Sequence, residues 1–209
     1  MTWSYERLGY LYFLEEDYAA AEKAYAVRQQ LTEQLYEEQP DYPVHVLGMA
    51  ASCCTRMQVF ERQGRFDEAL AIAIEGLQYG EELVQIDSQN ITYSNYYISG
   101  LSGAMRYYER TGNLEEAWKL VNRAIPAQAR TLNADPGVIH HARRLASLYL
   151  SAARIQQQRG RVRHALTLLD ELEALLSSYE TSHPDDRSFA NSRTQEQQLR
   201  AKVNQGLDQ

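Results

Sequence analysis

The chain of 209 residues is poor in several features that define common protein classes. Its only cysteines, Cys53 and Cys54, are neighbours, so they cannot staple distant segments or provide the paired spacing of a zinc site. The sequence has no run of about 20 apolar residues, so no membrane span is predicted. No basic segment leads into an apolar run at the N-terminus, so no secretory signal is predicted. These absences favour a reducing cytoplasm and no membrane partner.

Motifs of catalysis are also missing from the sequence. There is no phosphate loop, no dinucleotide-binding fingerprint and no nucleophile elbow. His140 and His141 are adjacent, so a helix would point them in different directions, which suits no metal site. We therefore predict that the protein is not an enzyme and has no catalytic residues, cofactor or metal. The net charge of −7 argues against nucleic acid as a partner.

The sequence does contain a phrase that returns every 48 residues. The segments FLEEDYAAAE, ERQGRFDEAL, ERTGNLEEAW and QQRGRVRHAL align without insertions on Glu16, Gly64, Gly112 and Gly160. A second marker keeps the same interval at Pro40, Ser88, Pro136 and Pro184. Between the two markers an alanine recurs at Ala21, Ala69, Ala117 and Ala165. A fixed period of this size is typical of a solenoid, in which each repeat buries its apolar face against its neighbours.

Each period is predicted to hold two helices. Residues 50–63 have the apolar spacing of a helix, and a second helix is predicted from Phe66 to about Ile86. Gly64 suits the left-handed cap that ends the first helix. The recurring alanine fits a place where the two helices of a hairpin approach closely, and its helix propensity is the alternative explanation.

The segment LGYLYFLEEDYAAAEKAY resembles the tetratricopeptide repeat (TPR), with matching residues at Leu8, Gly9, Tyr12, Tyr18, Ala21 and Tyr25. Later repeats are looser and have Met57, Met105 and Ala153 in place of Gly9. The resemblance covers about residues 2–180. The common repeat has about 34 residues, so a 48-residue period predicts helices of about 20 residues. The pattern is similar to long-repeat arrays in large bacterial proteins, including some serine/threonine kinases, although this chain has no kinase motif.

The resemblance implies an all-α fold, a right-handed superhelical solenoid of antiparallel helix hairpins. We predict one domain over 1–209, with repeats at about 1–40, 41–88, 89–136 and 137–184. Residues 187–207 are predicted to form a capping helix with a thin apolar stripe of Leu199, Val203 and Leu207. The period places the start of the first helix before residue 1, which indicates either a fragment of a longer array or a shortened first helix.

In this family the first helix of each hairpin lines a concave groove. The resemblance therefore implies candidate partner-binding residues at Tyr10, Phe13, Gln58, Arg62, Arg106, Arg110 and Arg154. The lysines and asparagines of the family's carboxylate clamp are absent, so clamp-type binding of chaperone tails is not expected. The arginines can hold the carboxylates or phosphates of an acidic ligand. The alternative is that they pair with Glu61 and Glu109 between repeats.

Charge is unevenly distributed along the chain. Residues 1–92 hold 16 acidic and 6 basic side chains, a net charge of −10, whereas residues 138–169 hold six arginines and no acid. Such a basic block can steer an acidic partner or dock on the acidic half of another copy, and a merely solvated face is the alternative.

Three functions follow from these observations. The leading hypothesis is a non-catalytic scaffold that holds a peptide or protein partner in the groove. The second is a regulatory or sensor module of a larger bacterial enzyme such as a kinase. The third is a self-assembling structural repeat.

Overall fold

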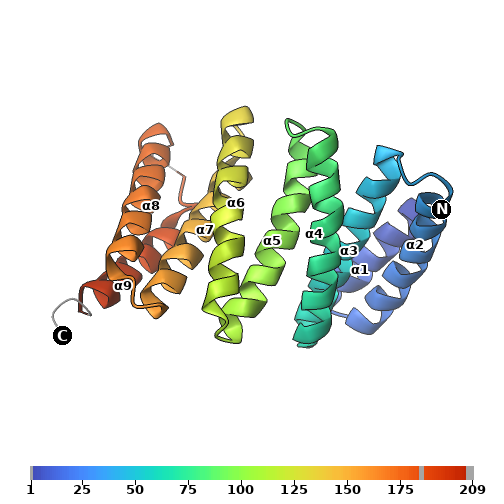
Figure 1. Ribbon diagram of the computed structural model, residues 1–209, viewed down its shortest axis with the longest axis horizontal. Coiled ribbons are helices and arrows are strands. Elements are labelled where there is room, and N and C mark those ends of the chain that lie inside the picture. Colours follow the sequence, from blue (N-terminus) through green and yellow to red (C-terminus); the bar gives the residue numbers. More distant parts are fainter. Residues whose placement is uncertain (1, 184–185, 206–209) are drawn as a thin grey trace. The chain divides into compact units, whose positions relative to one another are not determined.

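The computed structural model describes residues 2–183 and 186–205 (Figure 1). These residues form nine α-helices and no strand, which confirms the all-α fold. The chain divides into two compact units, Met1–Tyr107 and Tyr108–Gln209, which are described separately. The prediction of one domain over 1–209 stays a prediction. Unit 1 contains α1 (Thr2–Leu14), α2 (Tyr18–Glu38), α3 (Pro43–Gln63), α4 (Phe66–Ile86) and most of α5 (Ile91–Arg110), as far as Tyr107. Unit 2 contains the last residues of α5 and four further helices: α6 (Leu114–Ala134), α7 (Ile139–Gln158), α8 (Val162–Ser182) and α9 (Ala190–Gln205).

The even-numbered helices follow the 48-residue period without deviation. α2, α4, α6 and α8 have 21 residues each and begin at Tyr18, Phe66, Leu114 and Val162. The predicted bounds of α4, Phe66 to Ile86, are confirmed. α3 begins at Pro43, seven residues before the predicted apolar spacing starts, because proline is well suited to the first helical turn.

The glycines at the aligned turn positions adopt the left-handed conformation that the sequence predicts. Gly64, Gly112 and Gly160 have φ of 75°, 77° and 72°. At Gly64 the backbone N–H of the next residue, Arg65, donates to the carbonyl of Phe60 over 2.9 Å and so closes the end of α3. The N–H of Arg161, after Gly160, donates to the carbonyl of Gln156 over 2.9 Å in the same way.

The recurring alanine lies in the core of every repeat. Ala21, Ala69, Ala117 and Ala165 are all buried. In the first repeat Ala21 clusters with Tyr25 and Val59. Helix propensity alone would not require the alanine to be buried, so its burial agrees with the explanation by close helix packing.

Two positions, one helical turn apart, differ between α4 and α2. In α4 they are Gly76 and Gly80, and a Cβ on Gly80 would lie 2.6 Å from the Cα of Tyr97 in α5. The α4 and α5 backbones are therefore in direct contact. One period earlier, in α2, the same positions hold Arg28 and Thr32, which are also buried. The seam between α2 and α3 thus contains two polar side chains at positions where α4 has glycines.

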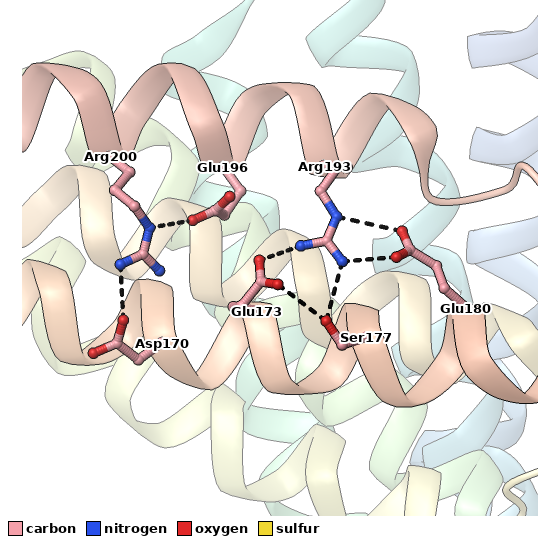
Figure 2. Close-up of polar contacts among 7 residues, drawn as sticks. All are labelled: Asp170, Glu173, Ser177, Glu180, Arg193, Glu196 and Arg200. Atoms are coloured by element: carbon pink, nitrogen blue, oxygen red, sulfur yellow. Dashed lines mark hydrogen bonds and ion pairs between the residues drawn. The ribbon is translucent and has the colours of Figure 1, made fainter.

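The last helix of unit 2 is held on α8 by ion pairs (Figure 2). Arg193 of α9 bonds to Glu173 and donates to Glu180 over 2.7 Å. Arg200 donates to Asp170 over 2.8 Å and to the buried Glu196 over 2.6 Å.

The capping helix begins at Ala190, three residues after the predicted position. Phe189, buried directly before it, makes an edge-to-face contact with Tyr179 of α8. Of the predicted apolar stripe, Val203 is buried and Leu199 is half-buried. Leu207, like the repeat marker Pro184, lies outside the described residues.

Candidate binding surface

The aromatic residues predicted to bind a partner lie together in unit 1. Tyr10 and Leu14 of α1 are exposed, Tyr10 to 55%, and Phe13 is half-buried against the ring of Tyr18 at 5.5 Å between centroids. From α3, the guanidinium carbon of Arg62 lies 5.8 Å from the centroid of the Phe13 ring. We call Tyr10, Phe13, Leu14 and Arg62 the first-helix patch. It combines exposed apolar area with a cation whose approach to the ring is favourable.

Two of the predicted arginines bond to the preceding repeat. Within unit 1, Arg106 donates to Glu61 over 2.6 Å, and these residues are 45 positions apart. Within unit 2, Arg154 bonds to Glu109 with the same offset of 45 positions. The structure therefore contains the pairing between repeats that the sequence offered as the alternative to ligand binding. A role of these arginines in holding an acidic ligand stays a prediction.

The remaining predicted residues are exposed. Gln58 of α3 donates to Cys54 Sγ over 3.6 Å, and that sulfur lies 3.2 Å from the hydroxyl of Ser99 in α5. Arg110 is exposed at the end of α5, in unit 2. Arg110 and Arg154 thus belong to unit 2 and the other five predicted residues to unit 1. A common binding site for all seven stays a prediction.

A cavity of about 340 Å³ opens in unit 1 between α1, α2 and α3, next to Tyr96 of α5. It is large enough for several side chains, and its walls are mostly apolar. We call it the α1–α3 cavity. Its lining residues include Trp3, Glu6, Arg28, Thr32, Leu35, Val44, Leu47 and Tyr96.

Arg28 is the buried charge of this cavity and is only 6% exposed. Its Nη1 donates to Ser52 over 3.3 Å, and its Nη2 lies 3.6 Å from the carboxylate of Glu6. Its Nε finds no hydrogen-bond acceptor within the described residues. A buried guanidinium N–H without an acceptor is costly to stability.

Arg28 is not among the residues predicted from the sequence to bind a partner. The signal was present in the repeat alignment, because Arg28 occupies the position that holds Gly76 one period later. A large charged residue at a position of close helix contact predicts a locally widened seam. The predicted core followed periodic apolar positions, and Arg28 is not one of them.

The reactivity of the buried thiol is low. Burial, together with the nearby Glu75 carboxylate, raises the pKa of Cys53 far above its usual range. A thiol in this state is not a nucleophile at neutral pH. In residues 2–183 and 186–205, no group of three metal-ligating side chains is found, and none of the helices there is long and apolar enough to cross a membrane.

Comparison with known proteins shows the fold. The chain is similar to TPR-like repeats of a candidate kinesin light chain from Podosopora anserina, with a TM-score of 0.66 and 18% identity over 98% of this chain and 86% of that one. It also aligns with a thermophilic TPR protein of Thermus thermophilus, over the whole of both chains, at a TM-score of 0.40 and 16% identity. No family model and no curated protein matches the sequence.

The fold is therefore a TPR-like array of helix hairpins.

Proposed function

We propose that the protein is a non-catalytic scaffold that binds a peptide or protein partner on the first helices of its hairpins. The observation that carries the proposal is the first-helix patch, where Tyr10 and Leu14 are exposed beside Arg62. Large exposed apolar side chains next to a cation are typical of protein-binding surfaces, since they gain burial and polar contacts together.

The partner is proposed to carry acidic groups. Arg62 is exposed near the patch, and its planar guanidinium can donate two parallel hydrogen bonds to a carboxylate. Arg106 donates to Glu61 through Nη2, and because a guanidinium has five N–H donors, its remaining donors can take part in binding while this bond is kept. We further propose a cytoplasmic location, because the cysteine content fits a reducing compartment.

The test is affinity capture from lysate of the native host, followed by mass spectrometry, with the double variant Tyr10→Ala and Leu14→Ser. Ile74→Ser is the matched control, since Ile74 is an exposed apolar residue of α4 outside the patch. We expect the wild type and the control to hold the same partner and the double variant to lose it, with unchanged melting temperatures. Equal capture by all three proteins would refute the proposal.

A second variant separates the charged contact from the apolar one. Arg62→Gln should weaken capture of an acidic partner and reduce its dependence on salt, because an exposed ion pair is screened. If Arg62→Gln leaves both the capture and its salt dependence unchanged, the partner does not use this cation.

A further inference from the structure

We propose that α9 is a salt-released strap, which detaches from α8 as one unit while the α7–α8 hairpin stays folded. In the attached state the strap covers an apolar face of α8, and its release makes that face available. The strap belongs to unit 2 and shares no residue with the first-helix patch. The inference therefore goes beyond the proposed function and does not rest on it.

The face of α9 that lies against α8 carries charged residues at positions where α7 has buried apolar ones. In α7 these positions hold Leu145, Leu148 and Ala152. One period later, in α9, they hold Arg193, Glu196 and Arg200. Figure 2 shows the two arginines pointing to carboxylates of α8. The charges thus lie on the inner face of this helix, where they contribute to its attachment.

The side of α8 that receives α9 has changed in the same direction. Three positions in α6 hold the half-buried apolar residues Ile125, Ala129 and Leu132. One period later, in α8, they hold Glu173, Ser177 and Glu180. All three bond to Arg193, and Ser177 accepts over 3.3 Å. Both sides of the α8–α9 seam therefore have polar groups at positions that are apolar one period earlier.

Salt acts selectively on such a seam. The carboxylates that hold α9 are partly in solvent, since the side chains of Asp170, Glu173 and Glu180 are 68%, 45% and 42% exposed. Added salt screens exposed ion pairs, whereas it does not screen the contacts of buried aliphatic side chains. Phe189 and Val203, at the two ends of the strap, are buried and keep its register in the attached state.

The face that the strap covers includes Leu176 and Tyr179 of α8. Leu176 is 0% exposed and occupies the position of Gly80 and Gln128 in earlier repeats. In both of those repeats this position meets the next odd-numbered helix: a Cβ on Gly80 would touch α5, and Gln128 donates to a carbonyl of α7. The ring of Tyr179 packs against Phe189 at 4.6 Å between centroids. Release of α9 would therefore expose an aliphatic and an aromatic side chain together.

The test is hydrogen–deuterium exchange of the whole chain in sodium chloride at about 0.01 M and about 1 M, where the Debye length is about 30 Å and about 3 Å. We expect peptides from both halves of α9 to exchange about tenfold faster at the higher salt, by the same factor. Peptides from α7 are the internal standard and should change less than about twofold. Equal changes in α7 and α9, or an α9 that does not respond to salt, would refute the strap.

A variant built from the chain's own repeat removes the ionic seam. It carries the residues of α6 and α7 at the six positions: Glu173→Ile, Ser177→Ala, Glu180→Leu, Arg193→Leu, Glu196→Leu and Arg200→Ala. We expect α9 of this variant to exchange more slowly than in the wild type and to lose its response to salt, because apolar contacts are not screened. A salt response that persists unchanged would show that other groups control α9.

Charge reversal distinguishes ion pairing from the size of the arginine side chain. Arg193→Glu places three acids together, so α9 should exchange rapidly even at low salt, and an apolar fluorescent dye should bind the uncovered face. Adding Glu173→Arg and Glu180→Arg restores opposite charges and should return α9 exchange to within about threefold of the wild type. An α9 that stays unprotected in the triple variant, or a dye signal that does not rise in Arg193→Glu, would overturn the proposal.

Discussion

At the scale of single residues, Gln156 in α7 departs most clearly from the repeat pattern. The equivalent positions in the other repeats hold the aromatic residues Tyr12, Phe60 and Tyr108. Gln156 is polar, yet it is 0% exposed. Within the described part of the chain, neither atom of its amide has a hydrogen-bond partner. A buried amide in this state costs stability.

Replacing Gln156 with methionine should therefore stabilise the protein by about 1–2 kcal/mol, because the side chain keeps its length and loses the unpaired polar atoms. Thermal unfolding followed by circular dichroism measures the effect. The same change at the exposed Gln158 should be close to neutral. A destabilised Gln156→Met protein would mean that the amide is satisfied in solution.

The pair Leu35 and Leu83 tests how the same residue at the same repeat position depends on its surroundings. Leu83 is enclosed by Val46 and Ala50, so Leu83→Ala should cost about 2–5 kcal/mol. Leu35 faces the α1–α3 cavity, so Leu35→Ala should cost less than about 1 kcal/mol. Urea unfolding of both variants provides the comparison. Equal costs would show that Leu35 is buried in solution.

At the scale of helices, attachment of α9 to unit 2 depends on Arg193, which Figure 2 shows between Glu173 and Glu180. Its side chain is mostly buried, so Arg193→Met leaves two carboxylates without their shared cation. We expect a loss of about 1–2 kcal/mol and faster amide exchange across α9, measured by hydrogen–deuterium exchange. Arg187→Met, at an exposed site before α9, is the control and should change neither quantity.

Contact between α3 and α5 includes the exposed pair Arg106 and Glu61. Because solvent screens this pair, a double-mutant cycle with alanine should give a coupling energy of only about 0.2–1 kcal/mol, decreasing with added salt. The same variants also test ligand binding. If Arg106→Ala reduces partner capture and Glu61→Ala does not, Arg106 contacts the partner; equal effects mean that the pair acts only through structure.

At the scale of the whole chain, the acidic residues 1–92 and the basic residues 138–169 have the complementary charge that end-to-end assembly would require. In unit 2, however, Arg154 and Arg159 already bond to Glu109 and Glu115. We therefore expect static light scattering to give the monomer mass at both low and high salt. A mass that falls as salt rises would support charge-driven self-assembly.

Periodicity predicts the repeated elements well because their causes are local. The span of α4, the left-handed glycines and the buried alanines all follow from residues within one 48-residue period. The start of α3 at Pro43 lay beyond the predicted apolar spacing, because helix starts depend on capping and on contacts with the next hairpin.

The candidate site was less predictable. The family resemblance predicted that Tyr10 and Arg62 lie on a binding face, and this stays a prediction; the structure adds the contact between Arg62 and the Phe13 ring. The same reasoning left open whether Arg106 bonds to a ligand or to Glu61, since that choice depends on a distance between repeats.

Amino-acid order alone determines the helical repeat of this protein, because apolar spacing, turn glycines and prolines act over a few residues. Packing between hairpins decided the rest: the ionic partners of Arg106 and Arg193, the burial of Arg28 and the cavity beside it. Those features depend on which helices lie next to one another and on where each begins. Two identical leucines, Leu35 and Leu83, are exposed and buried for that reason.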